Sequence, residues 1–156
     1  MKKTAILSDI NGNLEAMNAV LDDVECQRAD SVVFLGDAIG YGADSLACLD
    51  AMRQRADTYV MGRIEAKVSA QPIEWQTLTT ELPDASEILA SNLLPWLRAR
   101  PQSVQLNGLV AIHGNPRGPE HKCLSITELQ VRPESCLLYT SPSPRDQRGS
   151  RMPSSA

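Results

Sequence analysis

Short apolar runs alternate with segments of helical periodicity in the first half of the chain. The runs Ala5–Leu7 and Ser31–Leu35 lack polar alternation, which predicts strands buried on both faces. Between them, apolar residues recur at three- and four-residue steps across Leu14–Val24, as in an amphipathic helix. A further strand is predicted at Thr58–Met61. This strand and helix order predicts parallel pairing with right-handed crossovers, hence an α/β fold.

Residues with capping chemistry stand at the starts of the predicted helices. Asn13 can accept a hydrogen bond from the first free N–H groups of the first helix, and Asp44 or Ser45 can do so for the second. Asp84–Leu97 is also expected to be helical, interrupted at Pro95, which then lies in the first turn of a second short helix.

The segment Val104–Ile112 departs from the parallel pattern. Asn107 and Gly108 lie between two apolar runs, and an Asn-Gly pair there favours a tight hairpin turn, because both central residues need positive φ. We therefore expect an antiparallel pair of strands late in the domain.

Four residues with side chains that can bind metals each follow a predicted strand directly. They are Asp9, Asp37, Glu65 and His113. A single carboxylate after a strand often only caps the next helix. Four such residues are expected to converge in one cleft at the carboxyl edge of the sheet, where open α/β sheets bind ligands. Carboxylate oxygens and an imidazole suit a two-metal site that hydrolyses phosphoesters.

Three motifs around these residues resemble the calcineurin-like metallophosphoesterases, in particular their small bacterial phosphodiesterase-like branch. The motifs are Ser8–Ala16, Leu35–Gly42 and His113–Arg117. The resemblance covers about Lys3 to Pro119 and implies a four-layer α/β/β/α sandwich, incomplete at its C-terminus. It also implies a site for two divalent metals, typically Mn, Fe, Zn or Ni, that hydrolyses phosphodiesters or phosphomonoesters.

The resemblance implies a role for each matching residue. By position, Asp9 would bind the first metal, Asp37 would bridge both metals, and His113 would bind the second. Asn11 stands where the family has a histidine ligand, so this position keeps at best a weaker amide oxygen.

The segment Gly62-Arg63-Ile64-Glu65 replaces the family's Gly-Asn-His-Asp or Gly-Asn-His-Glu. Ile64 stands in place of the histidine that assists the leaving group, so no catalytic residue is assigned there. Arg63 stands in place of an asparagine ligand, and its charge is open to three interpretations. It could form an ion pair with Asp37 and Glu65, contact an anion, or lie beside a remaining metal.

The anion interpretation involves the turn before the first helix. The N–H groups around Gly12 and Asn13 lie at a helix N-terminus, where a phosphate could be held together with Arg63. The family's closing Gly-His-x-His motif does not occur in this sequence. We therefore expect a metal-dependent phosphoesterase with a degraded metal site. The alternative is an inactive pseudoenzyme that binds a phosphate-type anion or a protein partner.

The last residues, 136–156, carry several prolines and no apolar periodicity. They resemble a translated sequencing adapter more than protein sequence. We expect a partial metallophosphoesterase-like domain at residues 1–135, followed by a non-native, disordered tail.

Composition narrows the function classes further. The 156-residue chain has a formal net charge of −4, and because the tail holds three arginines and one aspartate, residues 1–135 are more acidic still. This argues against a nucleic-acid groove and leaves a phosphorylated small molecule as the expected partner. No segment reaches membrane-spanning length. The four cysteines lack a C-x-x-C pair, which favours reduced thiols in the cytoplasm. The oligomeric state stays open.

Overall fold

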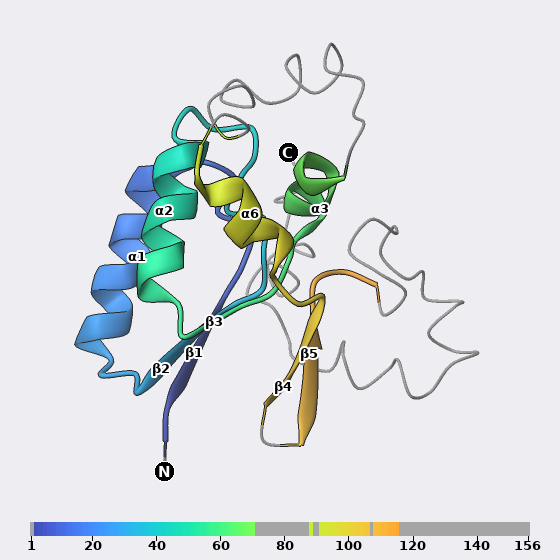
Figure 1. The fold of residues 1–156 in the computed structure, drawn as a ribbon. Coiled ribbons are helices and arrows are strands. Elements are labelled where there is room, and N and C mark those ends of the chain that lie inside the picture. Colours follow the sequence, from blue (N-terminus) through green and yellow to red (C-terminus); the bar gives the residue numbers. More distant parts are fainter. Residues whose placement is uncertain (1, 71–87, 89–90, 107, 116–156) are drawn as a thin grey trace, which may run out of the picture. The chain divides into compact units, whose positions relative to one another are not determined.

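Two separate sheets form in the described part of the chain, which is residues 2–70, 88, 91–106 and 108–115 of this computed structural model. The parallel sheet has the order β1-β2-β3, with strands β1 Thr4–Leu7, β2 Ser31–Phe34 and β3 Thr58–Tyr59 (Figure 1). The antiparallel sheet is the hairpin of β4 Ser103–Leu106 and β5 Leu109–Ile112. Both the parallel pairing and the hairpin are confirmed.

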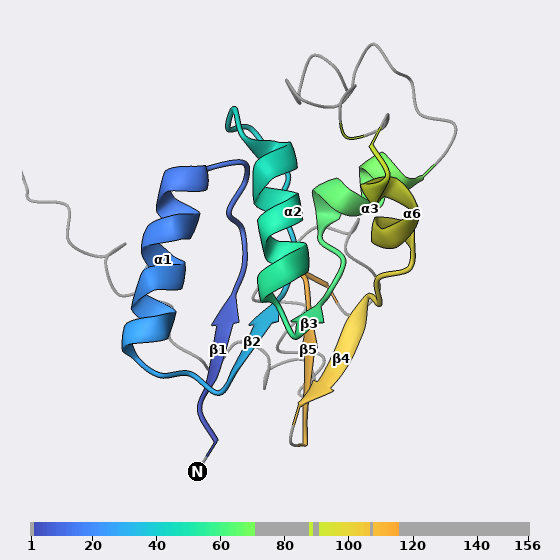
Figure 2. The ribbon, with the colours of Figure 1, turned by 60° about the vertical axis from the view of Figure 1, so that its left-hand side comes forward.

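Four helices accompany these strands in the described residues. They are α1 Leu14–Cys26, α2 Ser45–Arg55, α3 Arg63–Ser69 and α6 Leu93–Arg98. Figure 2 shows α1 and α2 side by side along the parallel sheet. The mixed α/β fold with two sheets is therefore confirmed.

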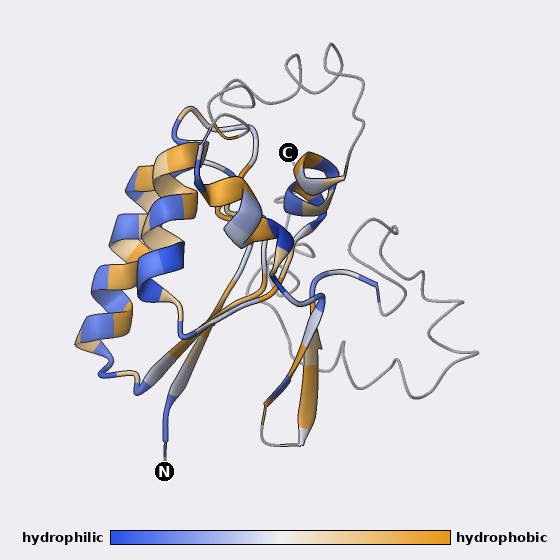
Figure 3. Ribbon diagram, in the orientation of Figure 1, coloured by the Kyte–Doolittle hydropathy of each residue, from blue (hydrophilic) through white to orange (hydrophobic). Residues whose placement is uncertain are grey.

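The core lies where α1 and α2 meet the middle of the parallel sheet. Met17 of α1, Phe34 of β2 and Leu49 of α2 belong to one cluster of buried apolar residues, and Tyr59 of β3 lies 5.0 Å from Phe34 between ring centroids. Burial of such side chains is the main stabilising contribution. By contrast, β5 is mostly hydrophobic (Figure 3), yet Leu109 is 68% exposed.

Strand β1 corrects one prediction. Its side chains alternate: Ala5 and Leu7 are half-buried, whereas Thr4 is exposed and Ile6 is 55% exposed. The prediction that this strand is buried on both faces is wrong, because β1 lies at the edge of its sheet and pairs only with β2 among the described strands. The same prediction fits β2 better, where Phe34 is fully buried.

The helix starts agree only partly with the expected caps. Asn13 caps α1 as predicted, accepting a hydrogen bond from the Ala16 N–H at 2.9 Å. Asp44 occupies the corresponding position before α2 but makes no capping bond with its side chain, while Ser45 is the first helical residue. Helix α6 contains Pro95 in its first turn, as predicted.

All described residues belong to one compact unit. The expected domain boundary after residue 135, the tail 136–156 and most of the helix expected from Asp84 lie outside the described residues. Within the described ranges, every helix is too short or too polar to cross a bilayer.

Candidate metal centre

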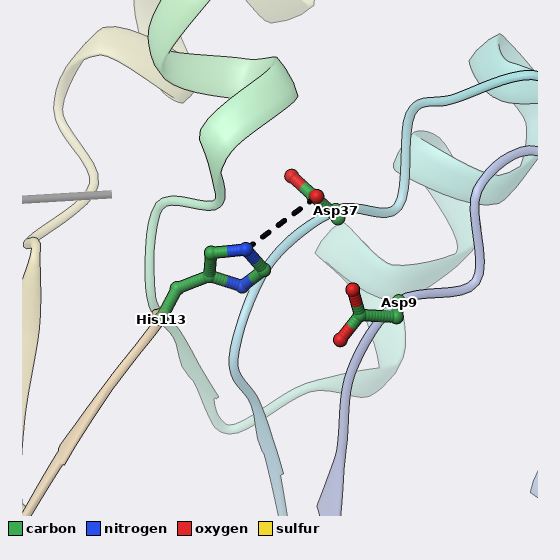
Figure 4. A group of neighbouring side chains, drawn as sticks. All are labelled: Asp9, Asp37 and His113. Atoms are coloured by element: carbon green, nitrogen blue, oxygen red, sulfur yellow. Dashed lines mark ion pairs between the residues drawn. The ribbon is translucent and has the colours of Figure 1, made fainter. Parts of the chain in front are cut away.

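Three of the four predicted ligands meet in one place. The ligand atoms of Asp9, Asp37 and His113 all lie within 4.8 Å of one another. Figure 4 shows the three side chains gathered from separate segments. Asp9 follows β1, Asp37 follows β2, and His113 follows β5 of the other sheet. Glu65 does not join this group.

The backbone beyond β1 and β2 explains how the two carboxylates are brought together. The Asp9 N–H donates to the Gly36 carbonyl at 3.0 Å, and the Asn11 N–H donates to the Asp37 carbonyl at 2.9 Å. The two loops thus continue the pairing of their strands. Asp9 and Asp37 both have a φ of 58°, in the left-handed region that few residues other than glycine adopt. Such conformations persist where neighbouring structure holds them, and they cluster at functional sites.

His113 is oriented by a backbone carbonyl. Its Nδ1 lies 2.7 Å from the Leu35 carbonyl oxygen. Because a carbonyl can only accept, Nδ1 carries a proton and donates it. The other nitrogen, Nε2, lies 3.4 Å from the Asp37 carboxylate. This is the usual arrangement of a metal-binding histidine, in which one nitrogen is held by a hydrogen bond and the other is left for the ligand.

Charges within the site stabilise one another. Burial opposes ionisation of Asp37, but the hydrogen bond from His113, the Ile64 N–H and the charge of His113 outweigh it, so the pKa of Asp37 is lowered. Burial likewise opposes the imidazolium form, yet contacts with Asp37 raise the pKa of His113. A cation that binds Nε2 must therefore compete with a proton held there by Asp37.

Glu65 binds the backbone of the Asp37 loop and is not one of the three gathered side chains. Its side chain is fully buried, and its carboxylate accepts hydrogen bonds from the Asp37 and Ala38 N–H groups and from the Tyr59 hydroxyl. Burial, reinforced by the charge of Asp37, raises the pKa of Glu65 to about 7. Two backbone N–H groups and a phenol hydroxyl are thus the hydrogen-bond donors to this carboxylate.

The turn before α1 contains the two N–H groups named in the anion interpretation, and both have partners inside the protein. The Gly12 N–H donates to the Ala38 carbonyl at 2.8 Å, and the Asn13 N–H donates to the Ile10 carbonyl at 3.1 Å. Both groups are already used inside the protein, so neither is available for an anion.

Asn11 lies against Gly40, where an added Cβ would approach the Asn11 side-chain oxygen to 2.5 Å.

Two tyrosines near the site were not predicted from the sequence. The Tyr59 hydroxyl binds Glu65, and the exposed Tyr41 hydroxyl lies 3.5 Å from an Arg63 guanidinium nitrogen. A tyrosine at the end of a buried strand requires a partner for its hydroxyl, and this could have suggested the contact of Tyr59. Nothing local could have identified Tyr41, whose contact depends on how the loop folds.

The three gathered residues fit a divalent cation. Two carboxylates and one imidazole form a donor set suited to Mn²⁺, Fe²⁺ or Zn²⁺. A metal site also requires its ligands to be oriented. The hydrogen bond to Leu35 orients the His113 imidazole so that Nε2 faces Asp37.

Comparisons with known proteins identify the family of the chain. Residues 2–115 match the family described as calcineurin-like phosphoesterase. An uncharacterized protein of Methanocaldococcus jannaschii is 29% identical over 132 residues, covering 74% of this chain and 51% of the relative. The crystal structure of a metallophosphoesterase from Sphaerobacter thermophilus aligns with a TM-score of 0.64 at 25% identity, covering 79% of this chain and 51% of that one. The chain thus spans about half the length of these relatives. It belongs to the calcineurin-like phosphoesterase family.

Proposed function

We propose that this chain comes from a lineage of divalent-metal-dependent phosphoester hydrolases and keeps a cation site while lacking efficient turnover. The observation that carries the proposal is the convergence of Asp9, Asp37 and His113 within 4.8 Å. Manganese is the first candidate cation, and a phosphorylated small molecule is the proposed ligand. The contribution of each residue to hydrolysis follows from its surroundings.

Asp37 and His113 are the fixed part of the site. Asp37 is 3% exposed, so its charge is little screened by water, and His113 presents Nε2 in a single orientation. Asp9 is exposed and would complete the ligand set from the solvent side. When bound, a divalent cation would supply Lewis-acid stabilisation to the phosphoryl oxygens.

The leaving group has no proton donor at the position where the family has one. Ile64 is 2% exposed and purely apolar, so it cannot protonate a departing oxygen. General acid catalysis typically contributes about 10²- to 10⁴-fold to such a reaction. We therefore propose weak or absent turnover together with retained cation binding.

Calorimetric titration with Mn²⁺ tests the cation site. The original chain is expected to bind with a dissociation constant that Asp37→Ala raises at least tenfold. An exposed charge change outside the ligand group, Arg53→Gln on α2, serves as the matched control, because Arg53 forms an ion pair with Asp50 of its own helix. Equal binding by the original chain and Asp37→Ala would contradict the proposal.

Hydrolysis of bis-p-nitrophenyl phosphate tests turnover. We expect no manganese-dependent rate above that of the Asp37→Ala variant. A clear rate in the original chain, abolished by a chelator and by Asp37→Ala, would instead establish a working enzyme and overturn the proposed loss of catalysis.

A second candidate function is anion binding by an inactive relative. One observation favours it: the Arg63 guanidinium lies near the exposed Tyr41 hydroxyl at the loop that follows Asp37. Arg63 begins α3 directly after Gly62, which touches the Asp37 backbone. A cation and a hydroxyl in this position are suited to phosphate oxygens.

Titration with inorganic phosphate in a metal-free buffer separates the two candidates. Anion binding predicts saturation that Arg63→Gln weakens and Arg53→Gln leaves unchanged. If phosphate binds only after Mn²⁺ is added, the cation-site proposal is favoured.

A reducing, cytoplasmic location is also part of our proposal, because Cys26 and Cys48 are free thiols.

A further inference from the structure

Glu65 has a buried carboxylate, and its two oxygens accept hydrogen bonds from the Asp37 loop and from strand β3. Its Oε2 accepts from the Asp37 N–H at 2.8 Å, and its Oε1 accepts from the Ala38 N–H at 2.7 Å. The Tyr59 hydroxyl donates to the same Oε1 at 2.9 Å. A carboxylate is fully buried only where donors replace the lost water, and these three donors do so.

The contact between the two loops is reciprocal. While Glu65 of α3 accepts from the backbone of Asp37, the Asp37 carboxylate accepts from the Ile64 N–H at 2.8 Å through its Oδ1. Each segment thus holds the other by a charge-assisted hydrogen bond. We call Glu65, Asp37, Ile64 and Tyr59 the carboxylate clasp.

Glycine makes this close approach possible. A Cβ atom at Gly62 would lie 2.1 Å from the Asp37 nitrogen and 2.4 Å from the Glu65 Oε2. The start of α3 therefore lies directly against the ligand loop, with no side chain between them.

The clasp acts on a residue in a conformation that needs support. Asp37 has a φ of 58°, which costs about 1 kcal/mol or more for a residue with a Cβ. The N–H groups of Asp37 and Ala38 both donate hydrogen bonds to Glu65, so the peptide groups before and after the Asp37 Cα are held in place. With Oδ1 held by Ile64, the other oxygen, Oδ2, lies toward His113 at 3.4 Å.

We propose that Glu65 is a positioning residue, which is held by Tyr59 and orients Asp37 for cation binding through the Asp37 and Ala38 N–H groups. This inference rests on the proposed cation site. It assigns Glu65 no contact with the cation or with substrate. It differs from a purely structural role, because it requires the cation affinity to depend on Glu65 beyond any change in stability.

The variant Glu65→Gln tests this directly. Glutamine has the size of glutamate, but an NH₂ group replaces one carboxylate oxygen. This NH₂ group cannot accept, so the hydrogen bond from Asp37 or those from Ala38 and Tyr59 are lost. We expect the dissociation constant for Mn²⁺, measured by calorimetry, to rise about 10- to 100-fold, as for other residues that orient a ligand. Tyr59→Phe removes one donor only and should raise it less.

Leu97→Ala is the matched control for stability. Leu97 of α6 is fully buried in the same core and takes part in none of the clasp's hydrogen bonds, so its truncation lowers the unfolding free energy while every donor and acceptor of the clasp is kept. Its Mn²⁺ affinity should stay within twofold of the original chain. If Glu65→Gln lowers stability but leaves the affinity within twofold as well, Glu65 is merely structural and the inference is overturned.

A metal-free measurement keeps the inference separate from the proposed function. The chain has two histidines, so the ring ¹⁵N signals of His113 can be assigned simply. If the original chain binds no Mn²⁺, the proposed function fails. In that case, a shift of the His113 Nε2 signal in Glu65→Gln, absent in Leu97→Ala, still supports positioning of Asp37. An unchanged signal overturns it.

Discussion

The two aspartates of the candidate centre lie in opposite surroundings. Asp37 follows the central strand β2, is 3% exposed, and is bound by Ile64 on one side and His113 on the other. Asp9 follows the edge strand β1, is exposed, and accepts a hydrogen bond from the neighbouring Ser8 hydroxyl. One half of the site is therefore part of the core, whereas the other half is part of the surface.

This difference separates two kinds of dependence. Changes at the β2 side should alter stability and cation binding together, because the same hydrogen bonds support both. Changes at the β1 side should alter binding with little effect on stability, since water can take the place of a side chain that is removed from an exposed edge.

The largest expected effect compares an apolar residue from each strand. Phe34→Ala in β2 should lower the unfolding free energy by about 3 to 5 kcal/mol, because Phe34 is fully buried against Tyr59. Ile6→Ala in β1 should cost less than about 1 kcal/mol, because Ile6 is 55% exposed. Urea unfolding measures both, and equal losses would mean that β1 is as buried as β2 in solution.

The second prediction concerns pH and belongs to the core side alone. Because the pKa of Glu65 is raised from 4.5 to about 7, the folded state holds a proton that the unfolded state has lost within this window. Stability should therefore be highest near pH 4.5 and fall toward pH 7, by up to about 3 kcal/mol. The raised pKa of His113 acts in the same direction above pH 6.5.

Urea unfolding of the metal-free chain at several pH values between 4.5 and 7.5 measures this slope. Glu65→Gln cannot titrate, so its slope should be much shallower. A stability that rises across the window in the original chain would contradict the assignment of a raised pKa to Glu65.

The third prediction compares the aspartates as ligands. Asp37→Ala should weaken Mn²⁺ binding more than Asp9→Ala, by about tenfold between the two variants, because a buried charge is less screened than an exposed one. Asp37→Ala should also lower the unfolding free energy, whereas Asp9→Ala should leave it nearly unchanged. Calorimetry and urea unfolding on the same samples provide the test. Equal effects of both variants would remove the proposed asymmetry.

Local sequence patterns were enough to predict the strands of this site and the three residues that follow them. Apolar runs and helical periodicity identified the strands, and a polar residue after each of β1, β2 and β5 identified Asp9, Asp37 and His113. The predictions of Asp9 and Asp37 depend on neighbours in sequence and on the rule that parallel strands end at one edge, whereas His113 follows a strand of the antiparallel sheet.

Contacts between distant segments could not be predicted in the same way. Glu65 was expected to follow a strand directly, but it lies in α3, and its carboxylate binds the Asp37 backbone because Gly62 lets α3 approach it closely. The exposure of Ile6 depends on which strands flank β1 in space. The N–H group of Gly12 is used by a carbonyl 26 positions later in the chain, that of Ala38. Each of these outcomes is decided by packing and not by local sequence.

The smallest expected effect comes from restoring family residues at three positions. The triple variant Asn11→His, Arg63→Asn and Ile64→His adds imidazoles and removes one positive charge near the site. We expect Mn²⁺ affinity to improve by less than about tenfold, equivalent to about 1.4 kcal/mol. The gain is limited because Ile64 is 2% exposed, so an imidazole there is introduced into an apolar pocket at a cost in desolvation.

Turnover by the triple variant should remain absent. The chain contains only His113 and His121, so the Gly-His-x-His motif that supplies two further ligands is missing even after the three exchanges. Hydrolysis of bis-p-nitrophenyl phosphate with Mn²⁺ is the measurement, and the triple variant combined with Asp37→Ala is the control. A manganese-dependent rate that appears in the triple variant and disappears with Asp37→Ala would mean that the core half of the site, with the restored residues, is sufficient for catalysis. We expect binding without catalysis, because Asp37 and His113 are held by hydrogen bonds while the further ligands of the Gly-His-x-His motif are missing.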